Sequence, residues 1–268
     1  MLKTMKGYSL PATMLSAMFT LSACGGGGGD SGTSSSSGSS GGGTLKGGLF
    51  ETEVTYANGD PDQSPVTYYS PTRRFVTVFG GDSALSFGRF ALDGSRLNGR
   101  SIDYRQLESS EQQNTEGFIE NKGGQEGAIN GTVNSQSSAN FRTADALGDV
   151  KSTANMRRLG LLSDLGISLS RASGTYVRGE STVALDVGAD GSLFAQYPEI
   201  GCTLNGTLSV PNASINVFDI DYTLSGCSLE RRDGDYSGAG YFVLQTDQMQ
   251  IAFAAHNGIV AMKFKGSR

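Results

Sequence analysis

Few residues in this sequence have the types and spacing that catalysis requires. The chain has one histidine, His256, which stands immediately before Asn257-Gly258, a dipeptide typical of two-residue hairpin turns. A Ser-His-Asp mechanism would have to use it, but no Gly-x-Ser-x-Gly elbow between a strand and a helix supports it, so we expect a solvent-exposed residue at a strand end. Asp219 and Asp221 stand two apart, on one face of a predicted strand, where carboxylates could hold Ca²⁺ or act as a pair. Because the alternate positions are apolar, we interpret both as the solvated side of that strand and predict no enzyme activity, no metal and no cofactor.

The N-terminus has the layout of a secretory signal peptide. Two lysines precede an apolar stretch that polar residues interrupt, and this stretch is too short for a membrane helix of roughly 20 apolar residues. Leu21-Ser22-Ala23-Cys24 ends it and resembles the lipobox of bacterial lipoproteins. The resemblance implies removal of residues 1–23 and attachment of acyl chains such as palmitate to Cys24; the alternative is an ordinary signal peptide with an incidental cysteine. Gly25, where inner-membrane lipoproteins favour aspartate, is similar to the class sorted to the outer membrane.

Residues 24–43 are predicted to be the lipidated cysteine and a flexible tether. After Cys24 they are Gly and Ser with one Asp and one Thr, which offer no apolar surface to offset the entropy of ordering. Such a chain has a root-mean-square reach of about 24 Å, from roughly 5 to 6 Å per square root of residue number. We expect the folded part to stand off the membrane, either on its periplasmic face or at the cell surface.

The charge of the chain argues against nucleic acid as a partner. The formal net charge is -5, and removal of a leader with two lysines and no acid makes the mature chain more acidic still. Proteins that neutralise phosphates need clustered basic residues, and here Arg73-Arg74, Arg157-Arg158 and Arg231-Arg232 are isolated pairs.

Cys202 and Cys227 remain once Cys24 is acylated. Because an even number of cysteines in an oxidising compartment favours a disulfide, we predict that these two are linked, with a redox pair or two free thiols as alternatives.

The C-terminal part, residues 174–268, is predicted to be an eight-stranded up-and-down β-barrel. Apolar residues alternate with polar ones in short runs that turn signals separate, as expected for half-buried antiparallel strands. Closure into a barrel would remove exposed strand edges. The expected strands are 174–179, 182–187, 191–196, 202–209, 215–224, 237–244, 248–254 and 258–264.

Residues 44–143 are predicted to form a related but less regular β subdomain. Strand signals recur near Phe50 to Tyr56, Phe75 to Phe79, Leu85 to Ala91, Leu97 to Tyr104 and Gly127 to Val133. The hexapeptide from Ala128 to Val133 is similar to that from Thr203 to Leu208, which hints at a duplication.

Residues 144–173 are predicted to be a helical linker. Alternation is lost there, and Met156, Leu159, Leu162 and Leu165 fall at helical spacing. We expect one short helix whose leucines make core contacts.

Almost the whole mature chain resembles a group of uncharacterised Gram-negative outer-membrane lipoproteins. The resemblance implies an all-β, antiparallel fold with halves similar to lipocalins or to the barrels of transferrin-binding protein B. It rests on Cys24 with its tether, Gly47 to Glu51, Ile129 to Val133, Gly174 to Tyr176, Gly201-Cys202, Val217 to Ile220 and Gly226-Cys227.

These observations lead us to expect a membrane-anchored binding or interaction module. Its partner would be an envelope or host protein, contacted through loops near Asn212 and Glu230 to Tyr236, or a small hydrophobic ligand inside the barrel. The alternatives are a passive structural lipoprotein of the envelope and, more weakly, a hydrolase.

Overall fold

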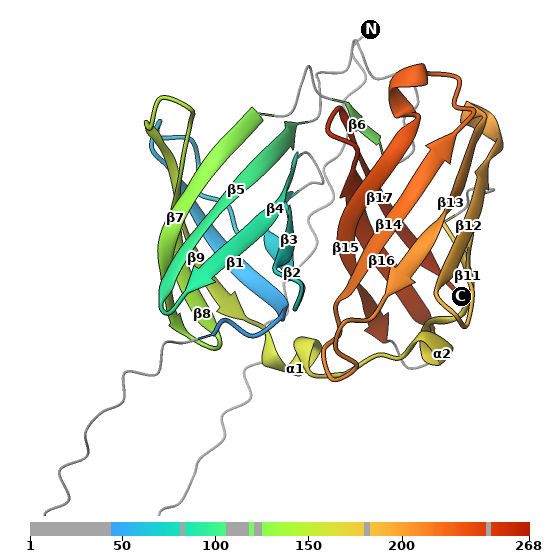
Figure 1. Ribbon diagram of the computed structural model, residues 1–268, viewed down its shortest axis with the longest axis horizontal. Coiled ribbons are helices and arrows are strands. Elements are labelled where there is room, and N and C mark those ends of the chain that lie inside the picture. The colour runs from blue at the N-terminus through green and yellow to red at the C-terminus, as the bar shows by residue number, and fades with distance from the viewer. Residues whose placement is uncertain (1–43, 81–83, 106–117, 121–124, 180–182, 245–247) are drawn as a thin grey trace, which may run out of the picture. The chain divides into compact units, whose positions relative to one another are not determined.

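Two eight-stranded antiparallel β-barrels make up the folded chain in the computed structural model (Figure 1). The structure describes residues 44–80, 84–105, 118–120, 125–179, 183–244 and 248–268, so Cys24, the leader and the tether lie outside it. The prediction of an all-β, antiparallel fold is confirmed. Within the described ranges, no helix has the length and apolar character that a membrane span requires.

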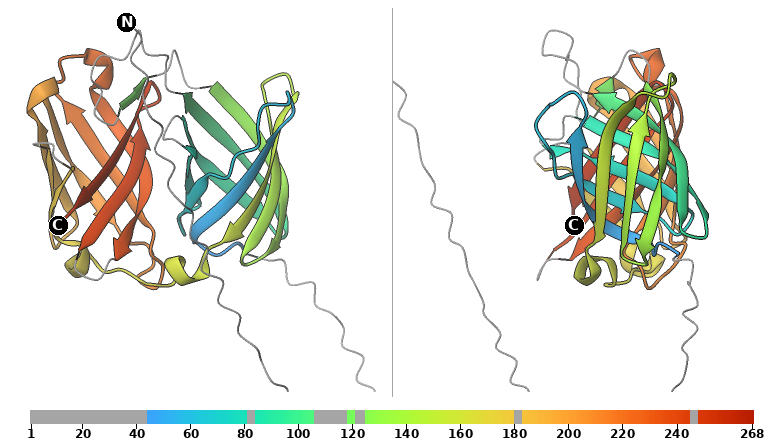
Figure 2. Two further views of the ribbon diagram at one scale, coloured as in Figure 1. Left: turned by 180° about the vertical axis from the view of Figure 1, so that it is seen from behind. Right: turned by 90° about the vertical axis from the view of Figure 1, so that its left-hand side faces the viewer.

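The first barrel is fully closed, since its last strand pairs with its first (Figure 2). Strand order around it follows the sequence, with one omission between the fifth and sixth members. Its strands are β1 (Gly48–Tyr56), β2 (Val66–Tyr69), β3 (Arg74–Val78), β4 (Ala84–Asp93), β5 (Arg96–Arg105), β7 (Gln125–Ser135), β8 (Ser138–Ala144) and β9 (Val150–Arg158).

The second barrel has the eight strands that the alternation predicts, again in sequence order. It closes through one residue pair, Val177 with Ser267, between its first and last strands. At its other end, the last strand pairs with β6 (Phe118–Glu120), a short strand that lies between β5 and β7 in the chain. The strands are β10 (Gly174–Val177), β11 (Ala184–Val187), β12 (Ser192–Tyr197), β13 (Cys202–Ser209), β14 (Phe218–Ser225), β15 (Gly234–Leu244), β16 (Met249–His256) and β17 (Val260–Ser267). Short 3₁₀ turns occupy Pro198–Ile200 and Glu230–Arg232.

The prediction of a helical linker over 144–173 is wrong in its first half. β9 covers Val150–Arg158 and completes the first barrel, and only α1 (Gly160–Ser163) and α2 (Leu169–Ala172) are helical. β9 alternates Ser152, Ala154 and Met156 inside with polar residues outside. Because the inward residues of β9 are small or polar, they differ little in hydrophobicity from its outward residues. The alternation that indicates a strand was therefore not recognised there.

The matched hexapeptides do not occupy equivalent strands. Gly131 lies in β7, the sixth strand of its barrel, whereas Gly206 lies in β13, the fourth of the other. Each glycine instead pairs with an aromatic residue, Phe141 or Tyr222, whose Cβ would overlap any side chain larger than the hydrogen of glycine. The similarity therefore reflects the same local packing solution rather than a register shared by two repeats.

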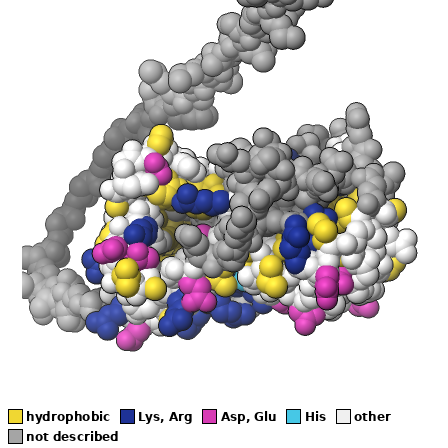
Figure 3. Space-filling model, turned by 90° about the horizontal axis from the view of Figure 1, so that it is seen from above, with side chains coloured by type: hydrophobic (Ala, Val, Ile, Leu, Met, Phe, Trp, Pro, Cys, Tyr) yellow, Lys and Arg dark blue, Asp and Glu magenta, His cyan; other side chains and the backbone are white. Residues whose placement is uncertain are grey.

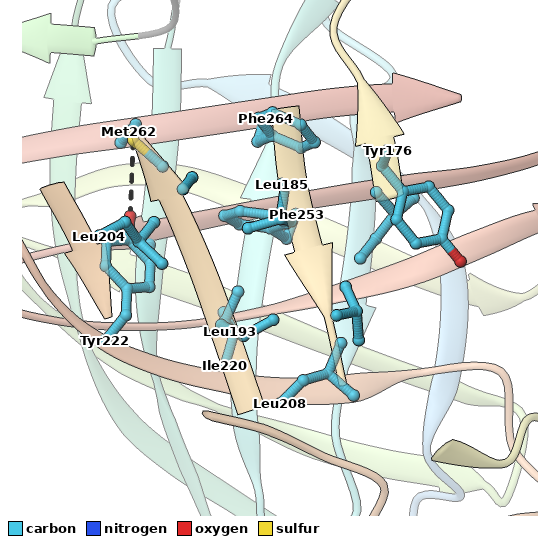
Figure 4. Close-up of a cluster of buried hydrophobic side chains, with 14 of the residues drawn as sticks. Tyr176, Leu185, Leu193, Leu204, Leu208, Ile220, Tyr222, Phe253, Met262 and Phe264 are labelled. Atoms are coloured by element: carbon cyan, nitrogen blue, oxygen red, sulfur yellow. Dashed lines mark hydrogen bonds between the residues drawn. The ribbon is translucent and has the colours of Figure 1, made fainter. Parts of the chain in front are cut away.

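Tightly packed apolar side chains fill the described interior of the second barrel. Tyr222 and Tyr236 stack with ring centroids 5.0 Å apart, and Phe253 and Phe264 stack at 5.4 Å. Figure 4 shows side chains from opposite strands meeting at the barrel axis, where the Tyr222 hydroxyl lies 3.7 Å from the Met262 sulfur. An interior of this kind offers packing stability rather than a ligand chamber.

Candidate functional site

The outer faces of the two barrels meet in an apolar junction. From the first barrel it contains Leu49, Tyr68, Val76, Leu85, Phe87 and Tyr104, and from the second Ile215, Val217, Ala239, Ala254 and Ala261. The alanines project outward from β15, β16 and β17, where small side chains permit close approach of the other barrel. Tyr68 and Tyr241 pack across it with ring centroids 4.9 Å apart.

Asp219 and Asp221 lie at the edge of this junction, and our interpretation of them as a solvated strand face is wrong for Asp219 but holds for Asp221, whose side chain is 52% exposed. Asp219 is 4% exposed, and its Oδ2 accepts a 2.7 Å hydrogen bond from the Thr72 hydroxyl. Arg74, 13% exposed in its side chain, donates to both carboxylate oxygens of Asp221 and, at 2.8 Å, to the carbonyl of Gly238. The alternation correctly placed both aspartates outside the barrel, but the sequence did not show that a second barrel covers that face.

His256 also belongs to the junction, contrary to the expectation of a solvent-exposed residue. Its ring packs on Phe87 with centroids 4.6 Å apart, and its Nδ1 lies 2.9 Å from the Tyr104 hydroxyl. Burial, with a smaller contribution from Arg74, lowers the pKa of His256 to about 4. The ring is therefore neutral at pH 7, and its contacts place it in a structural role.

The first barrel differs from the second in carrying a continuous row of polar side chains inside. Thr67 pairs with Thr77 across β2 and β3, Thr77 with Ser86 across β3 and β4, and Ser86 with Asp103 across β4 and β5. The hydroxyls of Thr52, Thr67 and Thr77 form a chain with two 2.9 Å hydrogen bonds. This row, which we call the polar belt (Thr52, Thr67, Thr77, Ser86 and Asp103), lies in the half of the barrel farther from α1.

Asp103 carries the charge of the polar belt. Its neighbour Tyr104 faces the junction, so alternation directs Asp103 into the barrel together with Ser101 and Leu97. Burial raises the pKa of Asp103, while Ser86, Arg105 and Ser101 act in the opposite direction. Ser101 is 2% exposed, and its Oγ has no well-formed hydrogen bond to a described residue.

A partly buried carboxylate beside such a hydroxyl can bind a group that donates hydrogen bonds. We therefore take the polar belt with Ser101 as the candidate site. Among the described residues, no three His, Cys, Asp or Glu side chains are grouped as a metal site requires.

The loops expected to bind a protein are exposed at Asn212 to Ser214 and at Glu230 and Arg231, and their binding role stays a prediction. Asn212 Oδ1 accepts hydrogen bonds from the backbone and side chain of Ser214, and the carbonyl of Ala213 accepts from Ile167 in the linker. Tyr236 lies inside β15 rather than in a loop, and its hydroxyl donates to the carbonyl of the buried Arg232.

The disulfide between Cys202 and Cys227 is present, with Cα atoms 4.1 Å apart. It joins the start of β13 to the segment after β14, as the strand boundaries suggested. Lipidation of Cys24 concerns a residue outside the described ranges and stays a prediction.

Two signals in the sequence could have indicated these sites. Outward positions of β15 to β17 hold alanine where a solvated strand would hold polar residues. Inward positions of β2 to β5 hold Thr, Ser and Asp where a packed core would hold Val or Leu. Neither signal can be interpreted until the strand faces are assigned, and that assignment needs the register.

Comparison with known protein families and with characterised proteins gives no match. Among solved structures, the Aeromonas veronii immune modulator A is similar at 10% sequence identity, with a TM-score of 0.34, over 84% of this chain and 95% of that chain. At this level the similarity carries no argument about function.

Proposed function

We propose that the protein is a lipid-anchored binding module of the outer membrane, held by acyl chains on Cys24, and that its first barrel takes a small polar ligand. The observation that carries the proposal is Asp103. A carboxylate inside a barrel, with a pKa that burial raises, lowers the stability of the fold, and such groups are typical of binding and catalytic sites.

The chemistry of the ligand follows from the polar belt. Hydroxyls can donate or accept, but an ionised carboxylate only accepts, so an amine or a group of hydroxyls is the complementary partner. Our earlier expectation of a hydrophobic ligand is not supported by this lining, and the second barrel is filled by its own side chains. No catalytic step is proposed, since His256 is held between Phe87 and Tyr104.

The test is recovery of a ligand from protein purified from its own cells. Small molecules released on denaturation are identified by mass spectrometry for the wild type, Asp103→Asn and the control Asp186→Asn, an exposed aspartate that accepts from Thr175. We expect a compound with amine or hydroxyl donors from the wild type and the control, and about tenfold less from Asp103→Asn, because a charged hydrogen bond contributes roughly 1.5 to 3 kcal/mol. No compound from any of the three would contradict ligand binding and favour a passive envelope component, and equal recovery from all three would contradict binding through Asp103.

A further inference from the structure

The one-turn helix α1 buries its serine and exposes its leucines. Ser163 is fully buried, whereas Leu161 is 92% exposed, Leu162 48% and, just after the helix, Leu165 44%. A surface helix ordinarily turns its apolar side to the protein. Single exposed leucines are common, but three within five residues form an apolar patch, which marks an interaction surface. We call Leu161, Leu162 and Leu165 the leucine face. Our expectation of core contacts is wrong for Leu162 and Leu165, whereas Leu159 packs against the junction.

Polar contacts from both barrels hold the leucine face in this orientation. The Ser163 hydroxyl accepts from the backbone of Leu49 at 2.9 Å and donates to the carbonyl of Leu159 at 2.7 Å. From the second barrel, the Asn216 side chain donates to the carbonyl of Leu162, and its backbone N–H donates to that of Ser163. The leucines are thus exposed on a segment with fixed hydrogen bonds, not on a loop that could fold them away.

The tether reaches the folded part beside this face. Lys46, two residues after the first described residue, forms a 2.8 Å ion pair with Asp164, which directly follows α1 and also binds Arg158. By sequence, only the Gly/Ser segment 25–43 separates Cys24 from this point. A bilayer that holds acyl chains on Cys24 therefore lies within reach of the leucine face.

Charge at this end suits an anionic lipid surface, although the chain as a whole is acidic. Strand directions place the β2–β3 and β4–β5 turns and both helices at one end. Among the described residues there, the exposed basic side chains outnumber the acidic ones: they are Lys46, Arg73, Arg96, Arg171 and Arg268, against Asp93, Asp164 and Asp190. On the opposite end, shown in Figure 3, the described hydrophobic side chains stand in small separate groups among charges of both signs.

From these observations we propose that the leucine face is a membrane-contact surface, which seats the folded part on the bilayer that bears its anchor. This inference rests on the proposed lipidation of Cys24. The leucines enter the headgroup region, while the surrounding arginines meet lipid phosphates. The tether then limits how far the molecule travels, and the leucine face decides which end points to the membrane.

The experiment measures vesicle binding without the lipid anchor. The mature chain with Cys24→Ser is mixed with vesicles of phosphatidylethanolamine and phosphatidylglycerol, and the bound fraction is measured by flotation. We expect weak, salt-sensitive binding that falls about tenfold or more in Leu161→Ser/Leu162→Ser/Leu165→Ser. The matched control is Leu147→Ser/Ile259→Ser, which removes two exposed hydrophobic side chains from the opposite end and should bind as the parent does.

A second arm uses the lipidated protein in vesicles that contain a photoactivatable phospholipid, and cross-links should concentrate at Leu161 to Leu165. No vesicle binding by the Cys24→Ser chain, equal loss in both variants, or cross-links of these leucines to a protein in intact cells would each overturn the proposal. Whether Cys24 is acylated is measured separately, from the mass of the N-terminal peptide. The flotation arm gives its answer without the anchor.

Discussion

His256 illustrates how packing changes the behaviour of a titratable residue. The unfolded chain binds a proton there near pH 6.5, but the folded chain does so only near pH 4. Since the unfolded state holds more protons between these values, stability is present above pH 6.5 and is lost as the pH falls towards 4.

We predict that the free energy of unfolding falls less for His256→Gln than for the wild type when the pH is lowered from 7 to 4.5. The difference is up to about 3 kcal/mol, because each unit of the pKa shift corresponds to 1.36 kcal/mol. Urea unfolding at the two pH values measures the difference. Because the chain has a single histidine, an NMR titration of its ring gives the pKa directly. A value near 6.5 would mean that the ring is solvated and the junction open.

The pKa of Asp103 is raised, whereas that of His256 is lowered, and this predicts how Asp103 affects the stability of the ligand-free protein. Burial raises the pKa of this carboxyl, so ionisation at neutral pH opposes folding, and the effect disappears at pH values low enough to protonate both states. We expect Asp103→Asn to be at least as stable as the wild type at pH 7, with the two curves converging in acid. A clear loss of stability at pH 7 would assign the carboxylate a structural role instead.

Among the elements, the β13–β14 pair is the one held by a covalent link. The disulfide spans 25 residues, and loop closure of this length stabilises by roughly 3 to 4 kcal/mol through the entropy of the unfolded chain. We predict that Cys202→Ala/Cys227→Ala lowers the free energy of unfolding by about that amount. Added reductant should lower the unfolding midpoint of the wild type and leave that of the double variant unchanged. Two alkylatable thiols in the native protein would refute the link.

Arg74 adds polar contacts to the apolar junction between the barrels, since it donates to Asp221 and to two carbonyls of the second barrel. We predict that Arg74→Met lowers the free energy of unfolding by about 1 to 3 kcal/mol, because it leaves these acceptors without their donor. The control is Arg157→Met, which removes an exposed ion pair with Glu51 and should cost about 1 kcal/mol or less. Equal effects would show that the barrels are not coupled through Arg74.

Strands with one apolar and one polar face could be predicted from the sequence, and strands whose two faces are similar in polarity could not. β13 and β14 alternate buried apolar with polar residues, and both were identified. β2, β8 and β9 place threonine, serine or alanine inside, so their period of two is weak and they were missed. The candidate site was missed for the same reason, because Thr77, Ser86 and Asp103 are recognisable as one row only when the register of four strands is known.

For the whole molecule, the contrast between the barrels matters most. The second barrel is packed with aromatic and aliphatic side chains, whereas the first divides into an apolar half near α1 and the polar belt beyond it. This arrangement places the proposed ligand site away from the leucine face. Membrane contact through the leucine face would therefore not involve the residues of the polar belt.

Attachment to the outer membrane is the claim on which this account chiefly depends. Mass spectrometry of the N-terminal peptide, from protein extracted from cell membranes, tests it directly. The account predicts a peptide that begins at Cys24 and carries the added mass of two or three acyl chains. A free thiol at Cys24, in protein recovered from the aqueous fraction, would contradict it.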